Sequence, residues 1–350
     1  MTIFRSLHAA KGLAAIWLVA GAGVAAADTL TISNWDGYMA PDAIAGFTAQ
    51  SGVQAEMVVH ATNEEIMGKL IASGGEGYYV VFVSSPFAEI LNNLGLAEPL
   101  DQSKIPNMAN LYTEATQLAH DPGNTFSVPY AWGTTGLCYR SDLIAAPTSW
   151  NDLLKPVPDL AGKITMLATD RWLLAAGFLA NGMSVNETNE TKLNTVRDAL
   201  IAAKKTLLAY DDTTFYAKLV SGEAVMTQAW DGWCNYGITD NAAIKYMIPS
   251  EGSDLWVDTM VILKGSKNKD AAYAFVDYIL DAQNHRWAAE NILYKVPNKA
   301  AMEGLDPALL VTYPNMAITP AELTAFEQLR DVGEAQRAYS RVVTEIMAAQ

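Results

Sequence analysis

The stretch of residues 126–139, FSVPYAWGTTGLCY, decides the fold. Its composition is that of an extended segment, and Gly133 and Gly136 stand on either side of two threonines. We interpret it as a strand that passes from one domain to the next. A second extended stretch, residues 255–263 (LWVDTMVIL), is predicted to cross back. A chain that leaves one unit and returns to it makes two lobes joined by a hinge.

Strands and helices alternate on both sides of this crossover, which is the pattern of a parallel α/β sheet. Residues 79–83 form a continuous apolar run, typical of a buried parallel strand, and end in a predicted turn at 84–86. The other predicted strands are 29–34, 53–59, 163–167 and 224–230. The predicted helices are 41–51, 63–72, 150–154, 172–181, 191–208, 214–221, 270–280, 283–292 and, in pieces, 320–348.

The sequence therefore predicts a two-lobed α/β fold with a hinge of two crossing strands. Lobe 1 comprises residues 28–134 and 258–310, and lobe 2 comprises residues 135–257 and 311–350. In such a fold a ligand lies in the cleft between the lobes, at the carboxyl ends of the strands.

The N-terminal residues predict export from the cytoplasm. Arg5 and Lys11 precede an apolar run at 12–24, and residues 25–27 (AAA) form an Ala-x-Ala cleavage site. This is the pattern of a secretory signal peptide over residues 1–27. The alternative is a membrane anchor, but the run is shorter than the roughly 20 residues that a spanning helix needs. We therefore expect a soluble periplasmic protein.

Composition and missing motifs exclude several classes. The net charge of −15 gives a surface that repels nucleic acid and anionic lipid. Phosphate-binding loops, dinucleotide fingerprints and nucleophile elbows are absent, and two cysteines with four scattered histidines show no metal-ligand spacing. We expect no enzyme, cofactor or metal. An oxidising compartment permits a Cys138–Cys234 disulfide, but the spacing in sequence leaves the pairing open.

Tryptophans point to the cleft. Rings at the rim of a sheet can hold an alkyl chain or an ammonium group, with packing in the core as the alternative. The tryptophans predicted just after strands or at helix starts are Trp35, Trp132, Trp172, Trp230, Trp233 and Trp256.

Asp258 supplies the charge that such a cleft needs. It follows Trp256 by two residues in a predicted strand, so the two side chains share one face. A carboxylate beside an indole suits an ammonium group. The alternative is an internal ion pair with a lysine or arginine.

The order of several short motifs resembles the periplasmic spermidine/putrescine-binding proteins of polyamine ABC importers. The resemblance runs from about residue 29 to about residue 336. It implies a periplasmic-binding-protein fold of type II-like form that closes on its ligand, acts as a monomer and docks on an inner-membrane permease. The motifs are Asn34-Trp35 with Tyr38, residues 127–133 (SVPYAWG), Gly222-Glu223, residues 255–258 (LWVD), Tyr294 with Pro297-Asn298, and residues 331–333 (DVG).

The resemblance also implies roles for single residues. Trp230 and Trp256 match two indoles that sandwich a methylene chain, and Asp258 matches a carboxylate that holds one ammonium. Further positions match aromatic or hydroxyl residues that contact the amine, and with the helix-start tryptophans they complete the candidate site: Trp35, Tyr38, Ser85, Phe87, Trp172, Trp233 and Tyr294.

The departures from the family concern the other acids. Trp172 and Trp233 stand where the resemblance implies acids, and Asp170 and Asp231 lie two residues before those positions. Asp258 is therefore the only ligand-binding acid of the family that this sequence matches directly. A cleft with one firm carboxylate suits a ligand with one cationic end, such as a quaternary ammonium compound or a γ-aminobutyrate-like zwitterion whose carboxylate Arg171 would bind. Polyamines are the ligand class that we expect first, and a single-cation or zwitterionic amine is the alternative.

Overall fold

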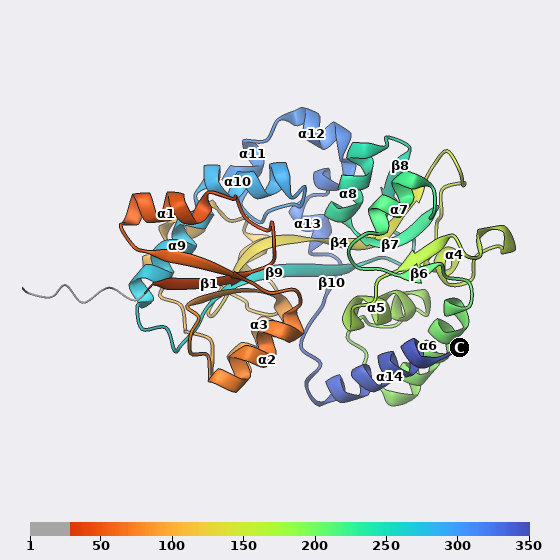
Figure 1. Ribbon diagram of the computed structural model, residues 1–350, viewed down its shortest axis with the longest axis horizontal. Helices are drawn as coiled ribbons and strands as arrows, with labels where there is room; N and C mark the ends of the chain where they lie inside the picture. Colours follow the sequence, from red (N-terminus) through yellow and green to blue (C-terminus); the bar gives the residue numbers. More distant parts are fainter. Residues whose placement is uncertain (1–28) are drawn as a thin grey trace, which may run out of the picture.

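The computed structural model describes residues 29–350, which form two halves connected across their middle (Figure 1). The predicted signal peptide lies outside the described residues. No helix of residues 29–350 is long and apolar enough to cross a membrane.

A mixed sheet runs through both halves in the order β2-β1-β3-β9-β4-β7-β5-β6, with β10 on β9 and β8 on β4. The predicted α/β class is confirmed. Pairing is parallel among β1, β2 and β3 and among β5, β6 and β7, but β9 runs antiparallel to β3 and β4. The strands are β1 (Leu30–Asn34), β2 (Ala55–Val59), β3 (Val80–Ser84), β4 (Val128–Arg140), β5 (Ile164–Met166), β6 (Ala209–Tyr210), β7 (Met226–Trp230), β8 (Ile244–Met247), β9 (Asp254–Ile262) and β10 (Glu327–Gln328).

Helices cover both faces of this sheet (Figure 1). They are α1 (Ala43–Ser51), α2 (Asn63–Ser73), α3 (Ser85–Asn93), α4 (Trp150–Leu154), α5 (Asp170–Ala180), α6 (Glu190–Lys204), α7 (Phe215–Ser221), α8 (Asp231–Asp240), α9 (Lys269–Leu280), α10 (Ala282–Asn291), α11 (Lys299–Glu303), α12 (Pro307–Thr312), α13 (Pro320–Leu323) and α14 (Gln336–Ala348).

The two predicted crossover stretches are β4 and β9, which pair antiparallel between Val128 and Thr134. The N-terminal part of β4 lies beside β9, and its C-terminal part pairs with β7. In turn, β9 pairs with β3 in the first half. These two strands therefore join the halves (Figure 1). The lobe boundaries at 134/135 and 257/258 fall inside them and remain a proposal.

Local sequence explains where the first-half elements begin and end. Thr62 caps α2 by accepting a hydrogen bond from the Glu65 amide, and Gly74 ends the helix in the left-handed conformation that glycine tolerates best. All five residues of β3 are buried, as its apolar run predicts. The predicted turn at 84–86 instead opens α3, because Pro86 fits the first helical turn.

The tryptophans of the crossing strands correct one prediction. Trp132 and Trp256 lie within β4 and β9, not after strand ends. Trp132 has no exposed surface and stacks on Tyr112 in a cluster with Leu255 and Val257. Because side chains alternate across a strand, this cluster occupies the face of β9 opposite Trp256.

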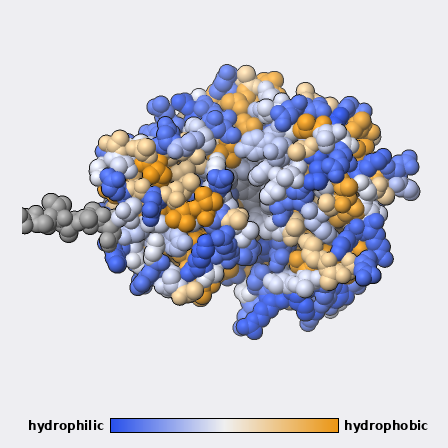
Figure 2. Space-filling model, in the orientation of Figure 1, coloured by the Kyte–Doolittle hydropathy of each residue, from blue (hydrophilic) through white to orange (hydrophobic). Residues whose placement is uncertain are grey.

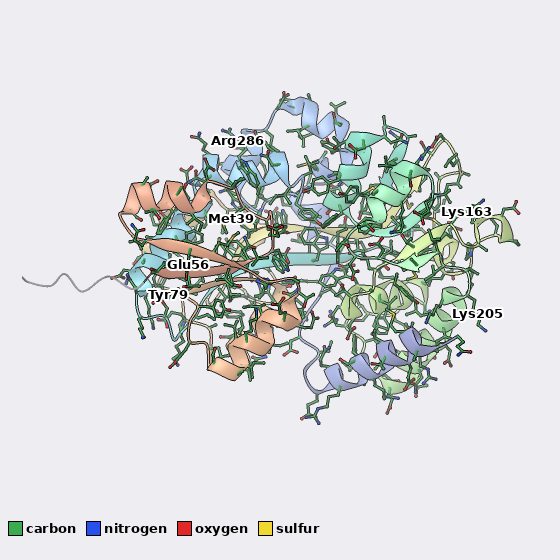
Figure 3. The ribbon with its side chains drawn as sticks, in the orientation of Figure 1. Met39, Glu56, Tyr79, Lys163, Lys205 and Arg286 are labelled. Atoms are coloured by element: carbon green, nitrogen blue, oxygen red, sulfur yellow. A yellow bond between two sulfur atoms is a disulfide. The ribbon has the colours of Figure 1, made fainter. Side chains whose placement is uncertain are left out.

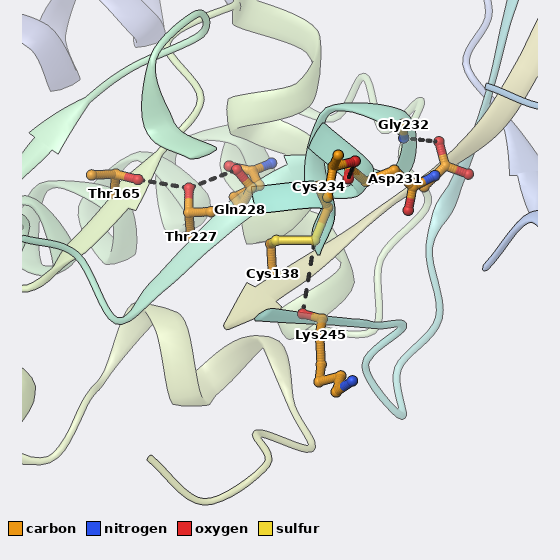
Figure 4. The surroundings of a disulfide bond; sticks show 10 residues. Cys138, Thr165, Thr227, Gln228, Asp231, Gly232, Cys234 and Lys245 are labelled. Carbon is orange, nitrogen blue, oxygen red and sulfur yellow. Dashed lines mark hydrogen bonds between the residues drawn. A yellow bond between two sulfur atoms is a disulfide. The ribbon is translucent and has the colours of Figure 1, made fainter. Parts of the chain in front are cut away.

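A disulfide joins Cys138 of β4 to Cys234 of α8 (Figure 4). Both side chains are fully buried, and the Lys245 carbonyl lies 3.8 Å from the Cys234 sulfur. The bond ties α8 to the sheet of the second half. Charged side chains such as Lys163 and Lys205 lie at the outer end of this half, far from the crossing strands (Figure 3).

Candidate binding site

The Asp258 carboxylate is the centre of the candidate site. It lies opposite Ser84 of β3 and Ala131 of β4. One oxygen accepts a hydrogen bond of 2.7 Å from the Tyr38 hydroxyl, and the other accepts one of 2.7 Å from the Ser84 hydroxyl. Burial raises the pKa of Asp258, and both hydrogen bonds oppose that rise. None of the ion pairs within residues 29–350 involves this carboxylate.

Aromatic rings surround this carboxylate in a chain of edge contacts. Trp256 and Tyr294 meet with ring centroids 4.8 Å apart, and Tyr294 lies 6.1 Å from Tyr38. Tyr38 in turn contacts Trp35 at 5.3 Å. Edge-to-face contacts of this kind stabilise a rigid wall. The structure thus brings together these four sequence-predicted residues around Asp258.

Small residues form the floor between the strands. Ala131, Gly133 and Thr135 alternate along β4, and Gly133 lies opposite Trp256. Residues paired across strands point to the same face, and Trp230 lies opposite Thr135 on the other side of β4. Trp230 and Trp256 therefore flank a strand whose own side chains are short, and the Trp256 indole and the Asp231 carboxylate occupy the space directly above Gly133.

The second half adds further rings. Trp230 and Trp172 are in edge contact with centroids 5.4 Å apart. Trp233 of α8 packs with Tyr216 and Tyr236. A cavity of about 270 Å³ lies between the group of Trp233, Tyr216 and Tyr236 and the first half, in the region where the space-filling view is hollowed between the halves (Figure 2). Its lining is Asp36, Gly37, Tyr38, Tyr216, Trp233, Tyr236, Ile292 and Tyr294.

Comparison with known proteins agrees with this geometry. Residues 42–317 match the model of a family described as bacterial extracellular solute-binding proteins. This chain belongs to that family. The chain is 30% identical to a putrescine/cadaverine-binding protein of Pseudomonas aeruginosa, over 94% of this chain and 96% of the relative. It is 31% identical to the putrescine-binding periplasmic protein PotF of Escherichia coli, over 81% and 84%.

A solved structure shares the fold over nearly the whole chain. It is described as a putative spermidine/putrescine ABC transporter from Listeria monocytogenes, with a TM-score of 0.84 and 29% identity over 93% of this chain and 100% of that one. The predicted two-lobed solute-binding fold and the predicted family are confirmed.

Two predicted residues of this solute-binding protein lie outside the group at Asp258. The Ser85 hydroxyl donates a hydrogen bond of 3.2 Å to the Leu329 carbonyl, and the neighbouring Ser84 contacts Asp258 in its place. Phe87 packs beside the separate cluster that includes Ile66. Tyr130, which sequence reasoning missed, donates a hydrogen bond of 2.5 Å to the Tyr38 carbonyl and so fixes the loop that carries Tyr38.

Both Nη groups of Arg171 are hydrogen-bonded to other residues of the chain. One Nη donates to the Arg330 carbonyl at 2.5 Å, and the other donates to Asn186 at 2.7 Å. The guanidinium also lies over the Tyr339 ring, 5.2 Å from its centroid. Arg171 therefore anchors the C-terminal segment to the second half. The displaced Asp170 lies within 3.4 Å of the Ser340 hydroxyl on α14.

Two fully buried acids lie close to the floor of the site. Asp231 accepts hydrogen bonds from the backbone amides of Gly232 and Thr134, and Lys295 provides a nearby positive charge. Burial nevertheless raises the pKa of Asp231 to about 7. Asp254 opens β9, and burial raises its pKa to about 7 as well. Both acids therefore make the unliganded site a poor environment for further negative charge.

Gly133→Ala is expected to damage both stability and ligand binding. A Cβ at Gly133 would lie 2.4 Å from Cζ2 of Trp256 and 2.5 Å from Oδ1 of Asp231, so both side chains must move. Overpacking of this kind costs about 1–3 kcal/mol. Chemical denaturation and amine titration measure the two effects. Gly68→Ala on the exposed face of α2 is the matched control, because no atom lies within 4 Å of its added methyl group. Equal behaviour of the two variants would contradict this packing.

Asp254→Asn is expected to stabilise the unliganded protein, and more so at high pH. The pKa of Asp254 lies above the unfolded value of 3.8, so its ionised form destabilises the fold fully above pH 7, and this cost disappears as pH falls from 7 toward 4. The gain for asparagine is on the order of 1–2 kcal/mol at pH 8.5 and near zero at pH 4.5. Denaturant midpoints at the two pH values measure it. A gain that does not depend on pH would contradict an ionised Asp254.

Proposed function

We propose that this chain is the periplasmic substrate-binding component of an ABC importer and that it binds polyamines such as putrescine or spermidine. The observation that carries the proposal is the Asp258 carboxylate, which Tyr38 and Ser84 hold and which no cation of residues 29–350 pairs with. An ammonium group would complete this arrangement with a charge-assisted contact. The names of the relatives support the same ligand class.

The roles of the aromatic residues follow from their positions. A methylene chain would pack against the rings of Trp230 and Trp256, which flank β4, and Tyr38, Tyr294 and Trp35 would close the end at Asp258. Methylene burial contributes about 0.8 kcal/mol for each group. An indole or phenol face also attracts the adjoining cationic end. Binding then draws the two halves together around the amine, because each half contributes part of this site.

The cavity beside Asp258 favours a second candidate, an amine with one bulky cationic end. Five of the residues that line it are aromatic, and Asp36 is its acid. Such a lining suits a quaternary ammonium group. A zwitterion that depends on Arg171 is disfavoured, because the Nη groups of that residue already bind Arg330 and Asn186.

The remaining parts of the proposal concern the cellular setting. We propose that residues 1–27 direct export and are removed, and that the mature chain is a monomer that presents its ligand to an inner-membrane permease without chemical change. Within residues 29–350 no group of three or more acidic, histidine or cysteine side chains is placed to hold a metal ion.

A thermal-shift panel tests the ligand class. Putrescine, spermidine, γ-aminobutyrate, choline and betaine are each added to the purified protein, and only compounds that bind the folded state raise the melting temperature. We expect putrescine or spermidine to give the largest rise. A rise with choline or betaine alone would favour the second candidate. Uptake of labelled putrescine by cells with and without the gene then separates import from sensing.

A further inference from the structure

Asp254, Trp256 and Asp258 alternate along β9. Pairing with β4 is regular from Leu255, opposite Thr134, to Asp258, opposite Ala131, and Asp254 lies opposite Glu327 of β10. Their side chains therefore share one face of the strand. At about 3.3 Å per residue, the two aspartates are roughly 13 Å apart along the strand, with the Trp256 indole between them.

Asp254 is a buried carboxylate without a hydrogen-bond partner. Its side chain is 0% exposed, and neither oxygen is hydrogen-bonded. The Thr135 hydroxyl and the Trp172 indole N–H lie near enough to lower its pKa, but neither reaches hydrogen-bonding geometry, and both lack other partners. A buried charge normally has partners, because its desolvation is otherwise costly. Acceptors and donors left open around one point indicate a place that a ligand group completes.

The groups near Asp254 offset its charge only in part. Arg171 attracts it, but the Nη groups of Arg171 are engaged elsewhere, and Asp254 forms no ion pair within residues 29–350. Asp231 adds like charge, and the neutral phenol of Tyr246 is also close. A cation at this point would relieve both burial and repulsion.

We propose that Asp254 is a second ligand-binding carboxylate, which accepts the far ammonium of a linear diamine whose first ammonium binds Asp258. This inference rests on the proposed function. Two N–O contacts of about 2.8 Å, subtracted from the roughly 13 Å spacing, leave about 7 Å between the ligand nitrogens. An extended chain of four or five methylene groups spans that distance, and it crosses Trp256 on the way.

Calorimetric titration with paired ligands tests this assignment. The ligands are 1,4-diaminobutane, 1,5-diaminopentane and the matched monoamine 1-aminobutane, and the proteins are the wild type, Asp254→Asn and Asp258→Asn. We expect Asp254→Asn to weaken both diamines at least about tenfold and to change the monoamine less than about twofold. Asp258→Asn weakens all three. Asp240→Asn, an exposed acid at the end of α8, controls for net charge and leaves all affinities unchanged.

The outcomes separate this inference from the proposed function. Diamine affinity retained in Asp254→Asn but lost in Asp258→Asn would overturn the role of Asp254 and leave the proposed function standing. A wild-type protein that binds no amine would overturn both. The wild type alone supplies a test that needs no variant: affinity across diamines of two to eight methylenes should peak at four or five, and a flat series would overturn the assignment.

Discussion

Asp258→Asn is expected to weaken amine binding about a hundredfold. The carboxylate is half-buried and is held by Tyr38 and Ser84, and no cation within residues 29–350 forms an ion pair with it. Removing one partner of a buried charge pair costs about 2–5 kcal/mol, and about 3 kcal/mol corresponds to this loss. Asparagine keeps the shape of the side chain, so the fold should persist. Calorimetric titration of putrescine into wild type and variant measures the change.

Tyr38→Phe is the matched control for this result. It removes one hydrogen bond to Asp258 but leaves the negative charge and the ring in place. A hydrogen bond to a charged group contributes about 1.5 kcal/mol or more, so this variant should lose roughly tenfold in affinity, less than Asp258→Asn. If Asp258→Asn binds putrescine as tightly as the wild type, Asp258 does not hold the ammonium and the proposed site is wrong.

Loss of the Cys138–Cys234 disulfide is expected to destabilise the unliganded protein by about 4–5 kcal/mol. The bond joins two residues with a sequence separation of 96. The entropy that a disulfide removes from the unfolded chain rises with the length of the loop that it closes. That loop contains β5, β6 and β7 with the helices between them. A Cys138→Ser and Cys234→Ser double variant should therefore unfold at a much lower denaturant concentration.

The comparison needs a control for the new hydroxyl groups. Both sulfurs are buried, so serine itself is unfavourable at these positions. A Cys138→Ala and Cys234→Ala variant leaves no buried hydroxyl and should still lose most of the same free energy of unfolding. A denaturation midpoint equal to that of the oxidised wild type would show that the disulfide adds nothing to stability.

The connection between the halves was predictable from sequence, because two long extended segments differ from the shorter strands around them. Both became crossing strands, β4 and β9. The shared face of Trp256 and Asp258 was predictable for a similar reason, since a period of two fixes which side chains in a strand point together. The same period applied two residues earlier indicates Asp254, which the sequence reasoning overlooked.

Other features depend on contacts between distant segments. Ser84 and Ser85 are adjacent in sequence, and only the end of β3 and the start of α3 decide which hydroxyl turns toward Asp258. Trp132 was expected to face the cleft, but its position in β4 turns it to the opposite face. The disulfide likewise requires β4 and α8 to be adjacent, which spacing along the chain cannot show.

Isothermal titration calorimetry of putrescine into the purified wild-type protein tests the central claim most directly. We predict saturable binding of one putrescine per chain with a Kd of about 1 μM or tighter, equivalent to about 8 kcal/mol. A titration that shows no saturable heat up to millimolar putrescine, in protein that unfolds cooperatively, would contradict the claim that this site binds a diamine.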